Sequence, residues 1–266
     1  MRTVVVIPTY NERENIPSLV ERILSIAAAR LDLFFIDDGS PDGTGQFLNT
    51  LSAMNPRVRV LHRPSKLGLG TAYRQAYRLL LKEGYARFIQ MDADLSHQPE
   101  AIPALLDAAE AADLVIGSRC CVGGSSKDMS GVRWALSRGA QRLTRLMLDL
   151  KVEDSTAGFR CYRRELLEVL DQLDICSTGY AFQVELTYYS QLLGFRVREV
   201  PITFEKREHA KSKMSCREVS SGMKTLARLW LHRVSKRVVT RPDPAREQGM
   251  LPPLLDLEPN PTKSSQ

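Results

Sequence analysis

Two aspartates separated by one alanine are the side chains of this sequence best suited to chemistry. Asp92 and Asp94 directly follow a short apolar stretch, 87–91, that has the composition of a buried strand. Two carboxylates at one strand end can share a hard divalent cation, Mg²⁺ or Mn²⁺, that bridges to a diphosphate. Such a cation offsets the negative charge on a departing nucleoside diphosphate. Acidic residues also cap helices, and a helix is expected near Pro99, but the strand-end position favours a metal site.

Two further polar motifs follow apolar stretches. The sequence 37–43 (Asp-Asp-Gly-Ser-Pro-Asp-Gly) contains a strong turn signal, so we interpret Asp42 and Gly43 as structural. We expect Asp38 to accept hydrogen bonds from the base or ribose of a nucleotide. In the stretch 8–12 (Pro-Thr-Tyr-Asn-Glu), Tyr10 offers a flat face for a nucleobase and Glu12 offers an acceptor for its N–H groups. The alternative for this stretch is a proline-terminated strand followed by an asparagine helix cap.

Basic residues supply candidate phosphate contacts. Arginine suits phosphate because its planar fork can bond two oxygens at once. A single surface arginine is usually only solvated, but several here lie in or beside predicted loops near the strand ends. The candidates are Arg119, Arg133, Arg207 and Lys213.

Strands alternate with helices in the first half of the chain, and this alternation predicts where the candidate residues lie. We expect strands at 3–7, 31–36, 58–62, 87–91 and 114–117, and helices at 15–28, 44–54, 68–83 and 100–111. This order predicts an α/β fold with a mostly parallel central sheet and helices on both faces. Ligands bind at the carboxyl ends of such sheets. The three motifs should therefore converge on one edge.

The second half is less regular. We expect a loop at 122–130, helices at 131–150, 164–173, 180–193 and 218–239, strands at 158–162 and 195–204, and a basic loop at 205–215. Residues 222–239 combine an apolar face with flanking cations, which fits either a membrane-surface helix or a core-packed terminal helix. Six prolines from Thr240 onward predict disorder. We therefore divide the chain into a domain at 1–240 and a tail at 241–266.

Composition narrows the class of protein. The 266 residues carry a net charge of +6, and the stretch 205–241 holds eleven Lys/Arg against three Asp/Glu. No signal peptide or membrane span is evident, so we expect a cytoplasmic protein with at most peripheral membrane contact. The five cysteines fit no disulfide framework.

The sequence lacks a G-x-G-x-x-G motif after its first strand and any G-x-x-x-x-G-K-[ST] loop, which disfavours dehydrogenases and P-loop NTPases. Gly68-Leu69-Gly70 is too weak a match to change this.

The motifs together resemble the dolichol-phosphate (polyprenyl-phosphate) mannose synthases, inverting enzymes of glycosyltransferase family 2 with the GT-A fold. The resemblance covers roughly 3–239. It is carried by PTYNEREN at 8–15, IDDGSPDGT at 36–44, LGLGTAY at 67–73, MDADLSH at 91–97, SRGA at 137–140 and VPITFEKR at 200–207, with Ser212-Lys213 behind it.

This resemblance implies GDP-mannose as donor, a polyprenyl or dolichyl phosphate as acceptor, and Mg²⁺ or Mn²⁺ as cofactor. It places Pro8, Tyr10, Glu12, Ile36 and Asp38 around the guanosine. It assigns Asp92 and Asp94 to the metal, with Ala93 lining the donor site. It assigns Arg133, Arg207 and Lys213 to the diphosphate or the acceptor phosphate, and suggests the same for Arg119. Asp94 and Arg207 are the residues we expect to contribute most to catalysis.

Three departures from the family pattern matter. Ala210 stands where relatives often carry glycine, and the C-terminal membrane helices of many relatives are missing. The chain therefore resembles the soluble type of catalytic subunit, which can need small membrane-protein partners. Ser130 precedes Arg133-Trp134 where processive relatives have Gln-x-x-Arg-Trp, which argues against polymer synthesis.

Two alternative functions remain open at this point. One is a polyprenyl-phosphate glucosyltransferase that uses UDP-glucose, and the other is a non-catalytic nucleotide-binding module that recruits partners to membranes. Nucleic-acid binding is disfavoured because the basic residues are not interleaved with aromatic stacking platforms.

Overall fold

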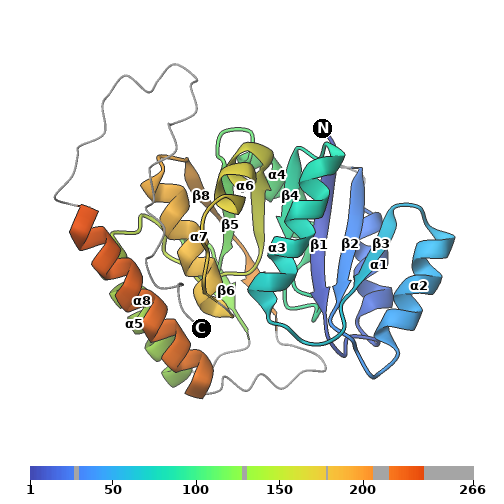
Figure 1. Cartoon of the computed structure of the whole chain (residues 1–266), viewed down its shortest axis with the longest axis horizontal. Coiled ribbons are helices and arrows are strands. Elements are labelled where there is room, and N and C mark those ends of the chain that lie inside the picture. Colours follow the sequence, from blue (N-terminus) through green and yellow to red (C-terminus); the bar gives the residue numbers. More distant parts are fainter. Residues whose placement is uncertain (27–29, 128–130, 178, 206–215, 237–266) are drawn as a thin grey trace, which may run out of the picture.

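A seven-stranded sheet forms the centre of the protein (Figure 1). The computed structural model describes residues 1–26, 30–127, 131–177, 179–205 and 216–236. In the sheet order β3-β2-β1-β4-β7-β5-β8, the strands are β1 (Thr3–Thr9), β2 (Leu31–Asp37), β3 (Val58–His62), β4 (Arg87–Gln90), β5 (Leu114–Ser118), β7 (Arg160–Arg163) and β8 (Val197–Pro201). A second, two-stranded sheet pairs β6 (Ser125–Ser126) with β9 (Thr203–Phe204).

Helices connect and cover these strands. The α-helices are α1 (Ile16–Leu24), α2 (Thr44–Met54), α3 (Leu69–Leu80), α4 (Ile102–Ala108), α5 (Gly131–Leu148), α6 (Arg164–Asp171), α7 (Tyr180–Leu192) and α8 (Cys216–Lys236). Two short 3₁₀ segments, η1 (Leu81–Glu83) and η2 (Pro99–Ala101), extend α3 and precede α4.

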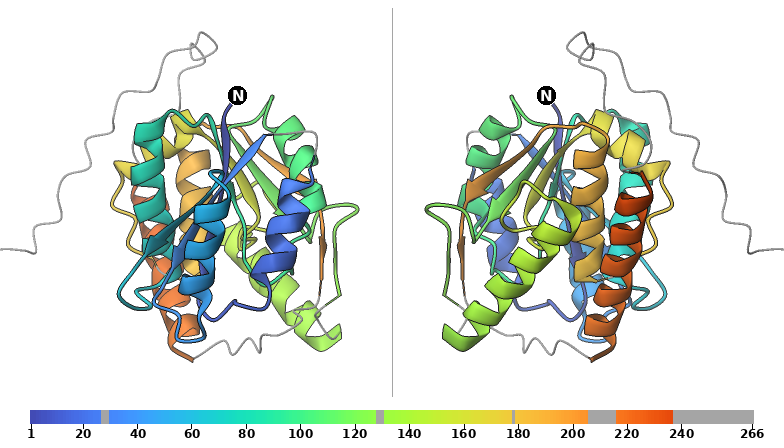
Figure 2. Two further views of the ribbon diagram at one scale, coloured as in Figure 1. Left: turned by 90° about the vertical axis from the view of Figure 1, so that its right-hand side faces the viewer. Right: turned by 90° about the vertical axis from the view of Figure 1, so that its left-hand side faces the viewer.

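The sheet has one apolar layer on each face, which is what buried parallel strands require. On one face, β-strand residues such as Val4 and Phe34 pack with α3, α6 and α7. On the other face, Val5 and Phe35 pack with α1, α2 and α4. Figures 1 and 2 show this three-layer arrangement from three sides.

The parallel register brings the strand ends that carry the polar motifs to one edge. Thr9 pairs with Asp37 at the ends of β1 and β2. Val6 pairs with Gln90 at the end of β4, and the Met91 amide continues this pairing by donating to the Val6 carbonyl at 3.2 Å. The three motifs identified in the sequence therefore begin side by side.

The predicted fold class is confirmed, with local differences. The strand predicted at 158–162 runs antiparallel between β4 and β5, a direction that residue pattern alone does not specify. The predicted loop 122–130 contains β6. The strand predicted at 195–204 is divided into β8 and β9 because Ile202 donates to Ser118 in the main sheet while its carbonyl accepts from Ser125. Helix α1 ends at Leu24, before the predicted Ala28.

The predicted tail at 241–266 and the basic loop that carries Arg207 and Lys213 lie outside the described residues. Among the helices that the structure describes, none has the length and apolar character needed to cross a membrane.

Candidate active site at the carboxyl edge of the sheet

The turn Asp92-Ala93-Asp94 follows β4 and is held in a defined conformation. Asp94 is buried, and its Oδ1 accepts hydrogen bonds from the amide and the hydroxyl of Ser96. Leu95 adopts a left-handed conformation with φ 60°, which bends the chain sharply after Asp94. The Asp92 side chain remains partly exposed. Two carboxylates are thus presented from a single tight turn.

His97 supports this turn from behind. Its ring is buried, stacks on Phe159 with centroids 5.2 Å apart, and meets the edge of Phe204. Its Nδ1 accepts a hydrogen bond from the Asp92 amide at 3.1 Å, which defines the tautomer with the proton on Nε2. A Cβ at Gly158 would stand 3.4 Å from Asp92 Oδ2 and 3.3 Å from His97 Cε1. The sequence marked His97 only as part of a family motif.

The adjacent aspartates at the end of β2, Asp37 and Asp38, have different environments. Asp37 Oδ1 accepts hydrogen bonds from the Ser40 and Thr9 hydroxyls, and a Cβ on Gly45 would come within 2.7 Å of Oδ2. Asp37 is therefore enclosed by its own turn. The Asp38 amide donates to the Thr9 carbonyl at 3.1 Å and joins the ends of β1 and β2. This leaves Asp38 as the carboxylate available to a ligand.

Arg63, which is not among the residues predicted from the sequence, lies against Asp38. Its Nε is 3.0 Å from Asp38 Oδ1, but the N–H is not aligned with the oxygen. Arg63 Nε, Arg63 Nη1 and Asp38 Oδ1 all lack hydrogen-bond partners among the described residues although they are buried. Buried groups of this kind are costly unless something satisfies them. A polar ligand bound beside this pair would do so.

The surroundings of Asp38 shape its charge. Burial raises the pKa of the Asp38 carboxyl above its ordinary value, and the positive charges of Arg63 and Lys66 only partly oppose this effect. The Lys66 ammonium also lies 4.7 Å from the centre of the Tyr10 ring. Tyr10 is exposed on the same rim. An aromatic face, a carboxylate and a guanidinium are thereby gathered at the ends of β1, β2 and β3.

The other predicted nucleotide contacts have defined surroundings. Glu12 accepts a hydrogen bond from the Asn15 side chain at 2.6 Å, and its amide donates to Thr44. Pro8 is half-buried at the end of β1. Ile36 and Ala93 are buried within the apolar layers on either face of the sheet, so any contact of the Ile36 side chain with guanosine remains a prediction.

The interpretation of Asp42 and Gly43 as turn residues is confirmed. The Asp42 carboxylate accepts from the amide and hydroxyl of Thr44 and from the Arg13 amide. Gly43 has φ 87°, which favours glycine.

The predicted phosphate-binding residues are only partly described. Arg119 forms a two-pronged ion pair with the buried Asp154, with Nε and Nη2 at 2.7 and 2.8 Å from its carboxylate oxygens. Arg133 lies in the first turn of α5, where the structure does not describe its side chain, and Arg207 and Lys213 lie outside the described residues. The phosphate contacts of these residues remain predictions.

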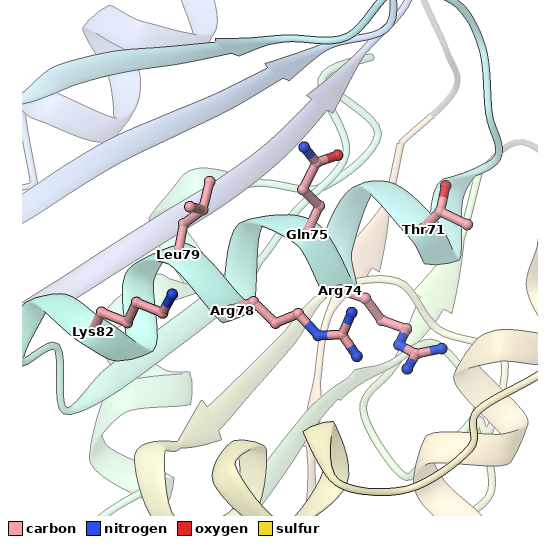
Figure 3. A pocket seen from close by; sticks show the side chains of 6 residues that line it. All are labelled: Thr71, Arg74, Gln75, Arg78, Leu79 and Lys82. Carbon is pink, nitrogen blue, oxygen red and sulfur yellow. The ribbon is translucent and has the colours of Figure 1, made fainter.

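An open hollow of about 410 Å³ runs along the solvent-facing side of α3 (Figure 3). Its lining residues all belong to the helix or its continuation, and they include Arg74, Arg78 and Lys82. Arg78 is paired with Asp171, and Arg74 donates to the Ile175 carbonyl. None of the strand-end motifs lines this hollow, so we assign the candidate active site to the sheet edge instead.

Comparison with known proteins identifies the family of the chain. The model of the family described as "Glycosyl transferase family 2" matches residues 4–171. The chain belongs to this glycosyltransferase family. It is 47% identical over 224 residues to a polyprenol monophosphomannose synthase of Mycolicibacterium smegmatis. This match covers 84% of each chain. It is 46% identical over 215 residues to an undecaprenyl-phosphate mannosyltransferase of Micrococcus luteus. This match covers 81% of this chain and 88% of that relative.

The fold of the glycosyltransferase also matches solved structures. One is glucosyl-3-phosphoglycerate synthase from Mycobacterium tuberculosis in complex with Mn²⁺, UDP-glucose and phosphoglyceric acid. The two structures superpose with a TM-score of 0.61, and their sequences are 22% identical. The match covers 91% of this chain and 81% of that one. At this identity the similarity establishes the common fold.

Proposed function

We propose that this glycosyltransferase transfers mannose from GDP-mannose to a polyprenyl phosphate and inverts the configuration at the anomeric carbon. The observation that carries the proposal is the 47% and 46% identity, over at least four-fifths of each chain, to two enzymes named for mannosyl transfer to polyprenyl or undecaprenyl phosphate. The geometry at the sheet edge supports it, because the carboxylate pair Asp92 and Asp94 and the group Tyr10, Asp38 and Arg63 lie at adjacent strand ends.

The turn at Asp92 and Asp94 has the donor set expected for Mg²⁺ or Mn²⁺. Both side chains supply oxygen, the ligand type that these hard cations prefer. No group of three candidate ligand side chains occurs within the described part of the chain. Mg²⁺ is commonly held by one or two carboxylates together with substrate phosphates and water, which fits this pair. When bound, the cation would offset the charge that develops on the departing diphosphate.

Asp38 and Arg63 suit a guanine base. The Watson–Crick edge of guanine carries two N–H donors that a carboxylate can accept together, while O6 and N7 can accept from a guanidinium. The partnerless buried atoms of this pair are one acceptor and two donors, which complements those groups. The Tyr10 ring on the same rim offers a stacking surface.

The acceptor needs little activation. A phosphate monoester is already anionic near neutral pH, so one of its oxygens can attack C1 of mannose directly. The new C1–O bond forms as the bond between C1 and the GDP oxygen breaks, and GDP takes the electron pair. The remaining difficulty is repulsion between two anions. We propose that Arg133, Arg207 and Lys213 reduce this repulsion.

An acceptor with a long hydrocarbon chain resides in a membrane. We therefore propose that the enzyme works peripherally at the cytoplasmic surface, where a nucleotide sugar is available, with or without small membrane-protein subunits.

A transfer assay tests the proposal. Purified enzyme is incubated with labelled GDP-mannose, a polyprenyl phosphate and Mn²⁺, with and without EDTA. We expect label in the organic phase only without EDTA, and we expect GDP to inhibit more strongly than UDP. Inhibition by UDP together with transfer from UDP-glucose would identify the glucosyltransferase alternative. Failure to transfer any sugar, with nucleotide binding intact, would identify the binding-module alternative.

Asp94→Asn provides the matched site variant. It keeps the size of the side chain but removes its charge, and we expect a rate loss on the order of 100-fold or more. Asp107→Asn, on α4, is a control that removes one carboxylate away from the sheet edge. Wild-type turnover of Asp94→Asn at saturating Mn²⁺ would contradict the assignment.

A further inference from the structure

Gln183, in the first turn of α7, is a buried polar residue that the proposed mechanism does not use. The residue is only 1% exposed. Its amide nitrogen and its amide oxygen both lack hydrogen-bond partners among the residues that the structure describes. Buried polar atoms are normally satisfied, because leaving them without a partner is costly. A buried amide with both ends unsatisfied therefore points to a group that binds to it.

The first turn of α7 packs against the part of α3 that reaches the Asp92 position. The Phe182 ring stacks on the Tyr73 ring of α3, with centroids 6.4 Å apart and an angle of 1° between the planes. The Tyr73 hydroxyl donates to the carbonyl of Met91, the residue before Asp92, at 3.4 Å. Burial, and next the negative charge of Asp92, raise the pKa of the Tyr73 hydroxyl well above its ordinary value.

Arg160 connects α7 to the same position by a second route. Its Nη1 donates to the Gln183 carbonyl at 3.0 Å and to the Thr187 hydroxyl at 2.9 Å. Arg160 begins β7 two residues after Gly158, where a Cβ would stand 3.4 Å from Asp92 Oδ2. The first turn of α7 is therefore joined by two separate routes to the residues around Asp92.

The geometry of the helix directs the Gln183 side chain toward the carboxyl edge of the sheet. Gln183 and Thr187 are four positions apart, so they share the face of α7 that meets Arg160. Helix α7 begins at the end of the molecule where β1 and β2 finish (Figure 1), and it runs away from this edge because the following strand, β8, is parallel to β5. Side chains of an α-helix lean toward its N-terminus. The Gln183 amide therefore leans toward the edge that carries the Asp92-Ala93-Asp94 turn.

The unsatisfied amide of Gln183 offers both a donor and an acceptor, and this selects the class of ligand. A hydroxyl group both donates and accepts, so two neighbouring hydroxyls of a sugar ring can satisfy the amide nitrogen and the amide oxygen together. An ionised phosphate offers only acceptors, and it would leave the amide oxygen without a partner. The pair of unsatisfied atoms therefore fits a sugar better than it fits a phosphate.

We propose that the Gln183 amide binds hydroxyl groups of the hexose carried by the sugar nucleotide and so contributes to the choice of sugar. This inference rests on the proposed function in that a hexose arrives at the carboxyl edge on a nucleoside diphosphate. A diphosphate held through a cation at Asp92 and Asp94 brings its hexose next to this turn, beside which α7 begins. Because isomeric hexoses differ in the orientation of their hydroxyls, a donor and an acceptor in fixed positions discriminate among them.

Transfer kinetics with the full chain test the proposal. Gln183→Met keeps the length of the side chain and removes both hydrogen-bonding atoms. We expect kcat/KM for GDP-mannose to fall about 10- to 100-fold, as for the loss of two neutral hydrogen bonds. The affinity for GDP should not change, because GDP lacks the hexose. Gln75→Met, the same substitution at an exposed position of α3, is the control and should leave both quantities unchanged.

Donor analogues that each lack one hydroxyl of the mannose identify the contact. The analogues are the 2-, 3-, 4- and 6-deoxy forms of GDP-mannose, and each is compared with GDP-mannose in the wild type and in Gln183→Met. For one or two of them, we expect the loss in kcat/KM to be at least about fivefold larger in the wild type, because the variant has already lost the partner of the missing hydroxyl. A residue that only supports the fold does not produce this dependence on a single hydroxyl.

The melting temperature separates binding from folding. Because the amide has no partner among the described residues, Gln183→Met should not lower the Tm of the ligand-free protein. A lowered Tm with unchanged transfer kinetics would show that a buried water satisfies the amide, and it would overturn the proposal.

Two further outcomes separate the proposal from the proposed function. Equal losses for every deoxy analogue in the wild type and in Gln183→Met would overturn the role of Gln183 while leaving mannosyl transfer in place. A wild-type enzyme that transfers glucose from UDP-glucose, and no mannose, would overturn the proposed function instead. The same comparison with deoxy analogues of UDP-glucose would then decide the role of Gln183.

Discussion

The Nδ1 atom of His97 accepts the hydrogen bond of the Asp92 amide at 3.1 Å. This contact connects a buried, stacked ring to the backbone of a proposed metal ligand. Groups that orient a ligand in this way commonly change metal affinity or activity by 10- to 100-fold when they are removed. His97 is therefore a positioning residue for the Asp92-Ala93-Asp94 turn.

We predict that His97→Phe weakens the binding of the metal more than it lowers the stability of the fold. Phenylalanine keeps the packing on Phe159 and Phe204 but has no acceptor for the Asp92 amide. We expect the Mn²⁺ concentration for half-maximal transfer to rise roughly tenfold. His97→Asn, which restores an acceptor, should recover part of this loss. An unchanged Mn²⁺ dependence in His97→Phe would show that the contact has only a structural role.

Much of the sheet edge could be predicted from the sequence because its strands have local signatures. Residues 44–54 and 58–62 were predicted with the bounds that the structure has. The antiparallel direction of β7 could not be predicted, because a strand between two others depends on contacts distant in the chain. The turn role of Asp42 was predictable from Pro-Asp-Gly alone.

Arg63 and Arg119 show what a sequence cannot reveal about the partners of charged residues. Both are arginines next to strand ends, and a sequence cannot tell which has a carboxylate partner. The phosphate contact of Arg119 stays a prediction, and in this structure its guanidinium is paired with Asp154, which lies 35 positions further along the chain. Arg63 was not predicted, although it lies against Asp38. The only sequence signal for Arg63 was its place directly after a strand.

Asp154→Asn is predicted to destabilise the fold strongly. Asp154 is fully buried and accepts from Arg119 and Gln141. Removing one charge from such a pair costs about 3–5 kcal/mol, measurable by urea unfolding at pH 7. Asp149→Asn is the control, because this carboxylate is 77% exposed where it pairs with Arg233 and should contribute under about 1 kcal/mol.

The difference in the free energy of unfolding between the wild type and Asp154→Asn should depend on pH. Burial alone would raise the pKa of Asp154, but the hydrogen bonds and charge of Arg119 outweigh burial and hold the pKa below its ordinary value of 3.8. A lowered pKa in the folded state stabilises the fold above the unfolded value and loses this effect as pH falls through the folded value. The gap between wild type and Asp154→Asn should therefore be full at pH 7 and shrink below about pH 4. A gap that does not change with pH would contradict the pairing.

The close packing around Gly70 explains why the sequence Gly68-Leu69-Gly70 has a glycine at its third position. A Cβ at Gly70 would come within 2.9 Å of the Phe182 ring and 3.2 Å of the Ser177 carbonyl. We expect Gly70→Ala to destabilise the protein by about 1–3 kcal/mol. Gly139→Ala, in α5 where nothing lies within 4 Å of a new Cβ, should instead stabilise it by roughly 0.5–1 kcal/mol. Equal melting temperatures for the two variants would show that α3 can move away from α7 at little cost.

Arg63→Met is predicted to weaken nucleotide binding and to change its pH dependence. Methionine fills a similar volume but removes the donors and the charge that face Asp38. We expect the dissociation constant for GDP, measured by calorimetry at pH 7, to rise about 10- to 100-fold, as for the loss of hydrogen bonds to charged groups.

The pH dependence follows from the pKa of Asp38, which burial already raises and which Arg63 opposes. Without Arg63 the pKa rises further, so Asp38 becomes protonated, and GDP binding is lost, at a higher pH in the variant than in the wild type. Arg78→Met removes an equal charge from the outer side of α3, where Arg78 pairs with Asp171, and should change neither the affinity nor the pH profile. If Arg78→Met rather than Arg63→Met weakened GDP binding, the nucleotide would lie in the hollow along α3 and not at the sheet edge.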